Sequence, residues 1–211
     1  MPIIDLLERN SKLYGEEVAL VELNPEHADK RRVTWKEYEL IQPTNTPVYR
    51  RELTWQAFDA QANRFANLLL ARGCGKGKKV AILLMNCLEW LPIYFGVLKA
   101  GCIAVPMNFR YSAEEIKYCT LLADVEVLVF GPEFTERMDA VIEDLTALKY
   151  VFFVGKDGPA YTEDVWEMMG YCSTSAPPVA LTEEDHAAIY FSSGTTGFPK
   201  AILHNHESLS Q

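Results

Sequence analysis

The feature that most constrains the fold is a regular succession of largely apolar runs between residues 80 and 154. Four such runs, at 80–85, 102–107, 125–130 and 150–154, lack the alternation typical of a strand with one wet face. Strands buried on both faces have this composition, because helices cover both sides of a parallel sheet. Segments long enough for helices separate the runs, so we predict crossover connections and a mainly parallel sheet. The predicted fold class is α/β.

Each intervening segment carries a signal for the start of a helix. An Asn-x-x-Glu pattern begins at Asn86, a Ser-x-x-Glu capping box begins at Ser112, and Pro132 suits a first helical turn. The expected helices run from 86 to just before Gly101, from 112 to about 123, and from 132 to about 148.

The remaining elements lie on either side of this region. We expect a short amphipathic helix over 3–14, a strand over 18–23 and a final buried strand over 187–191. Thr54 is positioned to cap a helix that ends at Gly73, with Phe58, Ala62, Phe65 and Leu69 on its apolar face. Segment 22–50 reads as an insertion that carries a further strand candidate at 31–35, and residues 1–211 otherwise form one domain.

Composition excludes several classes of protein. Hydrophobic residues make up 49% of the chain, which excludes general disorder, and the formal charge of −9 opposes binding to nucleic acid. The five cysteines form no C-x-x-C pair, which argues against a zinc site or a disulfide framework. No secretion signal and no uncharged apolar stretch of about 18 residues is visible, so we expect a cytoplasmic protein without an integral membrane segment.

One segment carries chemistry, and it directly follows the last buried strand. Residues 192–200 read Ser-Ser-Gly-Thr-Thr-Gly-Phe-Pro-Lys. Glycines bring backbone N–H groups close to a ligand, hydroxyls donate short hydrogen bonds and a lysine adds positive charge, so the segment predicts a phosphate-binding loop. It is not a Walker A loop, because Phe198 and Pro199 separate Gly197 from Lys200.

This segment resembles the signature of the adenylate-forming superfamily, which includes the AMP-dependent acyl-CoA synthetases. Residues 98–116 most resemble the fatty-acyl and aryl-CoA ligases, and the resemblance extends over nearly the whole chain. It implies the N-terminal part of the large domain of such an enzyme, which uses ATP to convert a carboxylic acid to acyl-AMP and then to acyl-CoA. ATP, Mg²⁺ and CoA are the implied cofactor and co-substrates, and the carboxylate is the small-molecule partner.

The resemblance also implies roles for individual residues. Lys200 would be catalytic and Ser192 would offer its hydroxyl to magnesium. His206 matches a histidine near the acyl-adenylate pocket. The phosphates would be bound by Ser192, Ser193, Gly194, Thr195, Thr196, Gly197 and Lys200.

Several alternatives stay open at this point. Ser192 is equally well read as a solvent-facing hydroxyl, and His206 as a histidine satisfied by local backbone. Ala201 replaces the glycine that usually follows Pro-Lys in the family, and motifs that bind ribose and complete adenylation have no counterpart before Gln211. We therefore expect this chain alone to be inactive. Transfer to a carrier-protein thiol, a luciferase-like reaction and a non-catalytic nucleotide-binding fragment remain as alternatives, and the acid and the oligomeric state are open.

Overall fold

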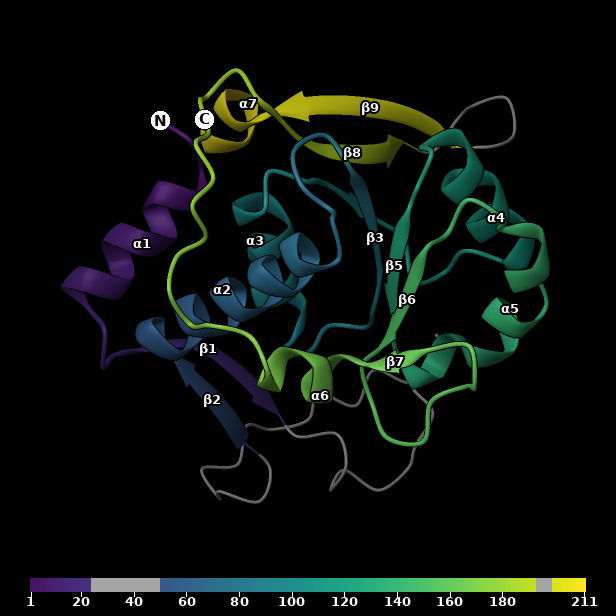
Figure 1. Cartoon of the computed structure of the whole chain (residues 1–211), viewed down its shortest axis with the longest axis horizontal. Helices are drawn as coiled ribbons and strands as arrows, with labels where there is room; N and C mark the ends of the chain where they lie inside the picture. The colour runs from purple at the N-terminus through teal and green to yellow at the C-terminus, as the bar shows by residue number, and fades with distance from the viewer. Residues whose placement is uncertain (24–49, 193–198) are drawn as a thin grey trace, which may run out of the picture.

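A seven-stranded sheet forms the centre of the computed structural model, which describes residues 1–23, 50–192 and 199–211 (Figure 1). Its strand order is β7-β6-β5-β3-β4-β8-β9, and every neighbouring pair is parallel except β8 and β9. The strands are β3 (Lys79–Leu83), β4 (Ile103–Pro106), β5 (Val127–Phe130), β6 (Tyr150–Phe153), β7 (Glu163–Asp164), β8 (His186–Ser192) and β9 (Lys200–Asn205).

Helices cover both faces of this sheet, which makes three layers (Figure 1). One face packs against α1 (Ile4–Leu13), α2 (Trp55–Ala71), α3 (Trp90–Lys99) and α6 (Val165–Gly170), and the other against α4 (Ala113–Leu122) and α5 (Thr135–Asp139). Successive β3 side chains enter opposite cores: Val80 and Ile82 face the α2–α3 side, whereas Ala81 and Leu83 face the α4 side. Burial on both faces explains why the strand sequences are continuously apolar.

The α/β fold class and the mainly parallel sheet are therefore confirmed. All four apolar runs contain a strand, each one or two residues shorter than predicted. Thr54 caps α2, since its hydroxyl accepts a hydrogen bond from the Ala57 N–H at 3.2 Å. Ser112 and Glu115 form the predicted capping box at the start of α4.

The predicted start of a helix at Asn86 is wrong, because α3 begins at Trp90. A helix starting at residue 87 would place Pro92 beyond its first turn, where the ring clashes with the preceding backbone. The Glu89 carboxylate also makes no capping hydrogen bond and instead accepts one from Arg51 at 2.7 Å.

The single helix predicted over 132–148 is also wrong. The segment forms a 3₁₀ turn at Pro132–Phe134, the short α5, and a second 3₁₀ turn at Ile142–Asp144. Its buried side chains, Phe134, Met138, Val141 and Leu145, recur at helical spacing. That spacing correctly indicates the buried face, but it does not require one continuous ladder of backbone hydrogen bonds.

A small antiparallel sheet of β1 (Val18–Leu23) and β2 (Arg50–Thr54) lies beside the N-terminus of α2 (Figure 1). Leu23 pairs with Arg50, so these strands bracket the proposed insertion. Residues 24–49, including the strand candidate at 31–35, lie outside the described residues. All five cysteines are free, and no helix in the described ranges is long and apolar enough to cross a membrane.

Candidate functional site: the β8–β9 hairpin

The β8–β9 hairpin brings the two ends of the predicted phosphate loop together. Ser192 is the last residue of β8 and pairs with Lys200, the first residue of β9. Directly opposed residues of antiparallel strands have their Cβ atoms about 4.5–5.5 Å apart and on the same face. The Ser192 hydroxyl and the Lys200 ammonium group therefore project from neighbouring positions, and both residues are exposed.

The hairpin places these two side chains on the face of the sheet that packs against α3. Tyr190 lies two residues before Ser192, and its hydroxyl is 2.8 Å from that of Tyr94 on α3. Side chains two apart on a strand share a face, so Ser192 follows Tyr190 toward this side. Parallel strands end at a common edge, where α/β folds bind their ligands.

The loop itself lies only partly within the described residues. Ser193, Gly194, Thr195, Thr196 and Gly197 belong to the range 193–198, which the structure does not describe. Pro199 is buried at the point where the chain re-enters the described region. The structure thus places the ends of the loop and leaves the roles of its central residues as predictions.

Lys200 forms no ion pair with a carboxylate within residues 1–23, 50–192 and 199–211. An exposed ammonium group that is not paired with a carboxylate is available to bind an anion from solvent. Lys200 lies opposite the end of β8, where the antiparallel ladder between β8 and β9 holds its backbone.

His206 lies at the opposite end of the hairpin. β9 runs from Lys200 to Asn205, and His206 is the first residue of α7 (His206–Ser210). At about 3.3 Å per strand residue, six residues separate it from Lys200 by roughly 20 Å. The structure therefore places His206 away from Ser192 and Lys200, and its position near an acyl-adenylate pocket stays a prediction.

Within the described residues, the ring of His206 also lacks the hydrogen bonds expected of a histidine bound by local backbone. Its backbone N–H donates to the Asp185 carbonyl at 3.0 Å, but neither ring nitrogen has a partner among the described residues. The side chain is fully buried. Burial lowers its pKa, and the nearby Asp185 and Asp5 carboxylates oppose that effect.

The side chains at the hairpin are too few to bind magnesium alone, but they suit a magnesium ion that is bound together with a nucleotide. Among the residues that the structure describes, no group of three His, Cys, Asp or Glu side chains could hold a metal ion. Mg²⁺ bound with ATP needs only one or two protein ligands besides phosphates and water. The exposed hydroxyl of Ser192 fits that requirement.

Sequence reasoning missed the aromatic group that supports the end of β8. Tyr94 joins Tyr190 by the hydroxyl contact, Trp90 stacks on Tyr94 with ring centroids 5.3 Å apart, and His204 packs edge-on against Tyr190. Tyr94 is buried in the core. Its pairing with Tyr190, 96 positions along the chain, had no local signal.

Comparison with known sequences shows the family of the chain. Residues 7–211 match the family described as AMP-binding enzyme. The chain is 32% identical over 158 residues to a long-chain-fatty-acid–CoA ligase of Mycobacterium tuberculosis, covering 74% of this chain and 30% of that protein. A 3-hydroxybenzoate–CoA/4-hydroxybenzoate–CoA ligase of Thauera aromatica is 31% identical over 161 residues, covering 75% and 31%. The chain thus spans about a third of the length of these relatives.

Solved structures show the same fold. An anthranilate–CoA ligase in complex with anthranoyl-AMP superimposes with a TM-score of 0.82 at 25% identity, covering 98% of this chain and 35% of that chain. The N-terminal domain of a Mycobacterium tuberculosis protein titled FACL13, with an inhibitor bound, gives a TM-score of 0.77 at 25% identity and covers 99% and 45%.

Proposed function

Because the chain belongs to the AMP-binding enzyme family, we propose that it supplies the phosphate-binding part of an ATP-dependent acid–CoA ligase. The observation that carries this proposal is the β8–β9 hairpin, which pairs Ser192 with an exposed Lys200 across the signature segment. The relatives support acids of two kinds, since their names include fatty-acid and hydroxybenzoate ligases.

In the proposed first half-reaction, a carboxylate oxygen attacks the α-phosphorus of ATP and pyrophosphate leaves, which gives acyl-AMP. The departing β- and γ-phosphates gain negative charge, so fixed positive charge near them lowers the barrier. The Lys200 ammonium group would stabilise these phosphates, and the hydroxyls and backbone N–H groups of residues 192–197 would bind them. Magnesium, held in part by the Ser192 hydroxyl, would neutralise phosphate charge.

In the second half-reaction, the CoA thiol attacks the acyl carbonyl and AMP leaves. Pyrophosphate has already departed at this stage, so Lys200 would contribute little. This asymmetry between the two steps distinguishes a phosphate-binding lysine from one that supports the fold.

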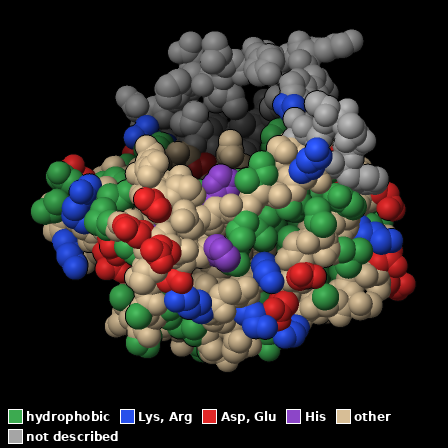
Figure 2. Space-filling view, turned by 90° about the horizontal axis from the view of Figure 1, so that it is seen from above, with side chains coloured by type: hydrophobic (Ala, Val, Ile, Leu, Met, Phe, Trp, Pro, Cys, Tyr) green, Lys and Arg blue, Asp and Glu red, His purple; other side chains and the backbone are tan. Residues whose placement is uncertain are grey.

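We also propose that residues 1–211 are the N-terminal part of a large domain. Exposed apolar side chains on both faces of β9 support this, since Ile202 and Leu203 are 47% and 49% exposed and point to opposite faces of the strand. Figure 2 views the side where β8, β9 and α7 lie, and apolar side chains gather there. We expect the 211-residue chain alone to form no acyl-AMP.

The experiment is acid-dependent exchange of labelled pyrophosphate into ATP, measured with the longer enzyme that the proposal requires and a panel of fatty and aryl acids. The proposal expects exchange with at least one acid and thioester formation when CoA is added. Exchange without a CoA thioester would favour a carrier-protein or luciferase-like acceptor. Nucleotide binding without exchange by any acid would contradict the ligase assignment and favour a non-catalytic module.

A further inference from the structure

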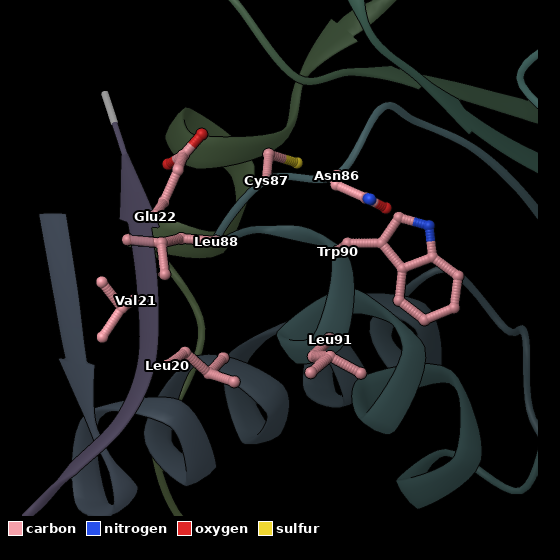
Figure 3. Close-up of a pocket in the computed structure, with 8 residues that line it drawn as sticks. All are labelled: Leu20, Val21, Glu22, Asn86, Cys87, Leu88, Trp90 and Leu91. Atoms are coloured by element: carbon pink, nitrogen blue, oxygen red, sulfur yellow. The ribbon is translucent and has the colours of Figure 1, made fainter. Parts of the chain in front are cut away.

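A cavity of about 620 Å³ lies between β1 and the connection from β3 to α3, and its lining includes neither Ser192 nor Lys200 (Figure 3). Its walls are mainly apolar, with Leu20, Leu88 and Leu91 among them. A volume of this size and a largely apolar lining with few polar groups are typical of sites for small organic molecules. The polar groups that are present therefore indicate which molecules fit.

Among the described residues, the ionised groups at one end of the cavity are two carboxylates and one guanidinium group, which leaves an excess of negative charge. Glu22 lines the cavity and pairs with Arg51 at 2.8 Å, and the same Arg51 nitrogen is 2.7 Å from Glu89. Two carboxylates thus share one guanidinium group. The Glu22 side chain is only 13% exposed, so water screens this charge weakly.

The pKa of Glu22 also indicates that its negative charge is only partly compensated. Burial raises it above its ordinary value, even though Arg51 acts to lower it. A carboxylate whose ionised form is incompletely compensated gains from a further positive charge nearby. A ligand cation beside Glu22 would supply that charge.

The other end of the cavity is aromatic. Figure 3 shows Glu22 and Leu88 at one end and Trp90 at the other, with Cys87 between Glu22 and Trp90. Stacking on Tyr94 holds the Trp90 ring in place. Burial raises the pKa of the Cys87 thiol to about 12, so this side chain contributes an uncharged wall.

We propose that this cavity binds an organic amine with an elongated apolar body, its ammonium group beside Glu22 and its apolar end against Trp90. The negative end repels carboxylates and phosphates, so neither ATP nor the acid of the proposed ligase reaction is the ligand. The site is additional to the β8–β9 hairpin, and its test does not depend on the ligase activity.

Three probes that share one body separate charge from apolar contact: 4-phenylbutylamine, 4-phenylbutanol and 4-phenylbutanoate. Titration calorimetry with the purified chain should show the amine binding at least tenfold more tightly than the carboxylate, with the alcohol between them. Equal or tighter binding of the carboxylate, or binding of none of the probes, would overturn the proposal.

Two variants and a control assign the binding to this cavity. Glu22→Gln keeps the shape of the side chain and should reduce the preference for the amine at least fivefold, whereas Glu17→Gln, which changes an exposed carboxylate outside the cavity lining, should leave it unchanged. Asn86 is exposed and lies between Cys87 and Trp90, so Asn86→Trp should block all three probes without disturbing the core. An unchanged preference for the amine in Glu22→Gln, or amine binding that persists in Asn86→Trp, would refute the proposed site.

Discussion

Replacement of Lys99 by methionine should destabilise the chain strongly, because this lysine is buried among three helices. Its side chain on α3 is 1% exposed, and Nζ is 3.0 Å from Glu8 of α1 and 2.9 Å from Asp59 of α2. Methionine preserves the length and apolar stem of the side chain, so the variant tests the charge. It leaves two facing carboxylates without their common partner.

The expected cost follows from the burial of the partners. Removal of one member of a buried ion pair costs about 3–5 kcal/mol, because the remaining charge stays desolvated. The Glu8 and Asp59 side chains are 33% and 19% exposed, so partial hydration places the expected loss near the lower end, about 3 kcal/mol. For a chain of this size that loss corresponds to about 6–12 °C in melting temperature.

Urea unfolding followed by circular dichroism measures this loss, and Lys76→Met is the matched control. Lys76 is 56% exposed and pairs with Asp185 at 2.8 Å, so its loss should cost about 1 kcal/mol or less. Adding Glu8→Gln and Asp59→Asn to Lys99→Met should recover part of the stability, because the unpaired charges are then removed. The reasoning is refuted if Lys99→Met costs no more than Lys76→Met.

Three further predictions concern stability. Gly96→Ala should cost about 1–3 kcal/mol, since the new Cβ would lie 2.8 Å from the Ala62 carbonyl oxygen, whereas Gly170→Ala meets open space; equal urea midpoints would contradict this. Thr54→Ala should cost about 1 kcal/mol by removing the α2 cap, and Thr54→Ser should restore most of it. Burial lowers the pKa of His206 from 6.5, so the unfolded chain binds a proton more readily than the folded chain. The free energy of unfolding should therefore fall as the pH drops through 6.5, and His206→Gln should make it less dependent on pH.

The elements predicted well from the sequence are those whose local pattern determines the structure. The strands of the parallel sheet follow from continuous apolar runs, and the starts of α2 and α4 follow from the hydroxyl caps of Thr54 and Ser112. Local patterns fail where a tertiary contact competes with them. Glu89 resembles a capping residue in sequence but pairs with Arg51 from a distant strand.

Two strands had no readable pattern. The two residues of β7, Glu163 and Asp164, are polar and owe their strand geometry to pairing with β6. β9 is exposed along most of its length, so it lacks the buried face that produces a pattern. The candidate site rests on the composition of residues 192–200 and stays a prediction, while the distance of His206 from Lys200 follows from the antiparallel return of β9, which had no pattern in the sequence.

The most direct test of the central claim separates the two half-reactions in the longer enzyme. One donor at a developing charge typically contributes about 10²–10³ in rate, so Lys200→Ala should slow ATP-dependent formation of acyl-AMP by about that factor. The same variant supplied with synthetic acyl-AMP should transfer the acyl group to CoA at nearly the original rate, and Lys12→Ala, which removes an exposed lysine on α1, should affect neither step. The account is contradicted if Lys200→Ala impairs thioester formation from acyl-AMP as severely as it impairs adenylation.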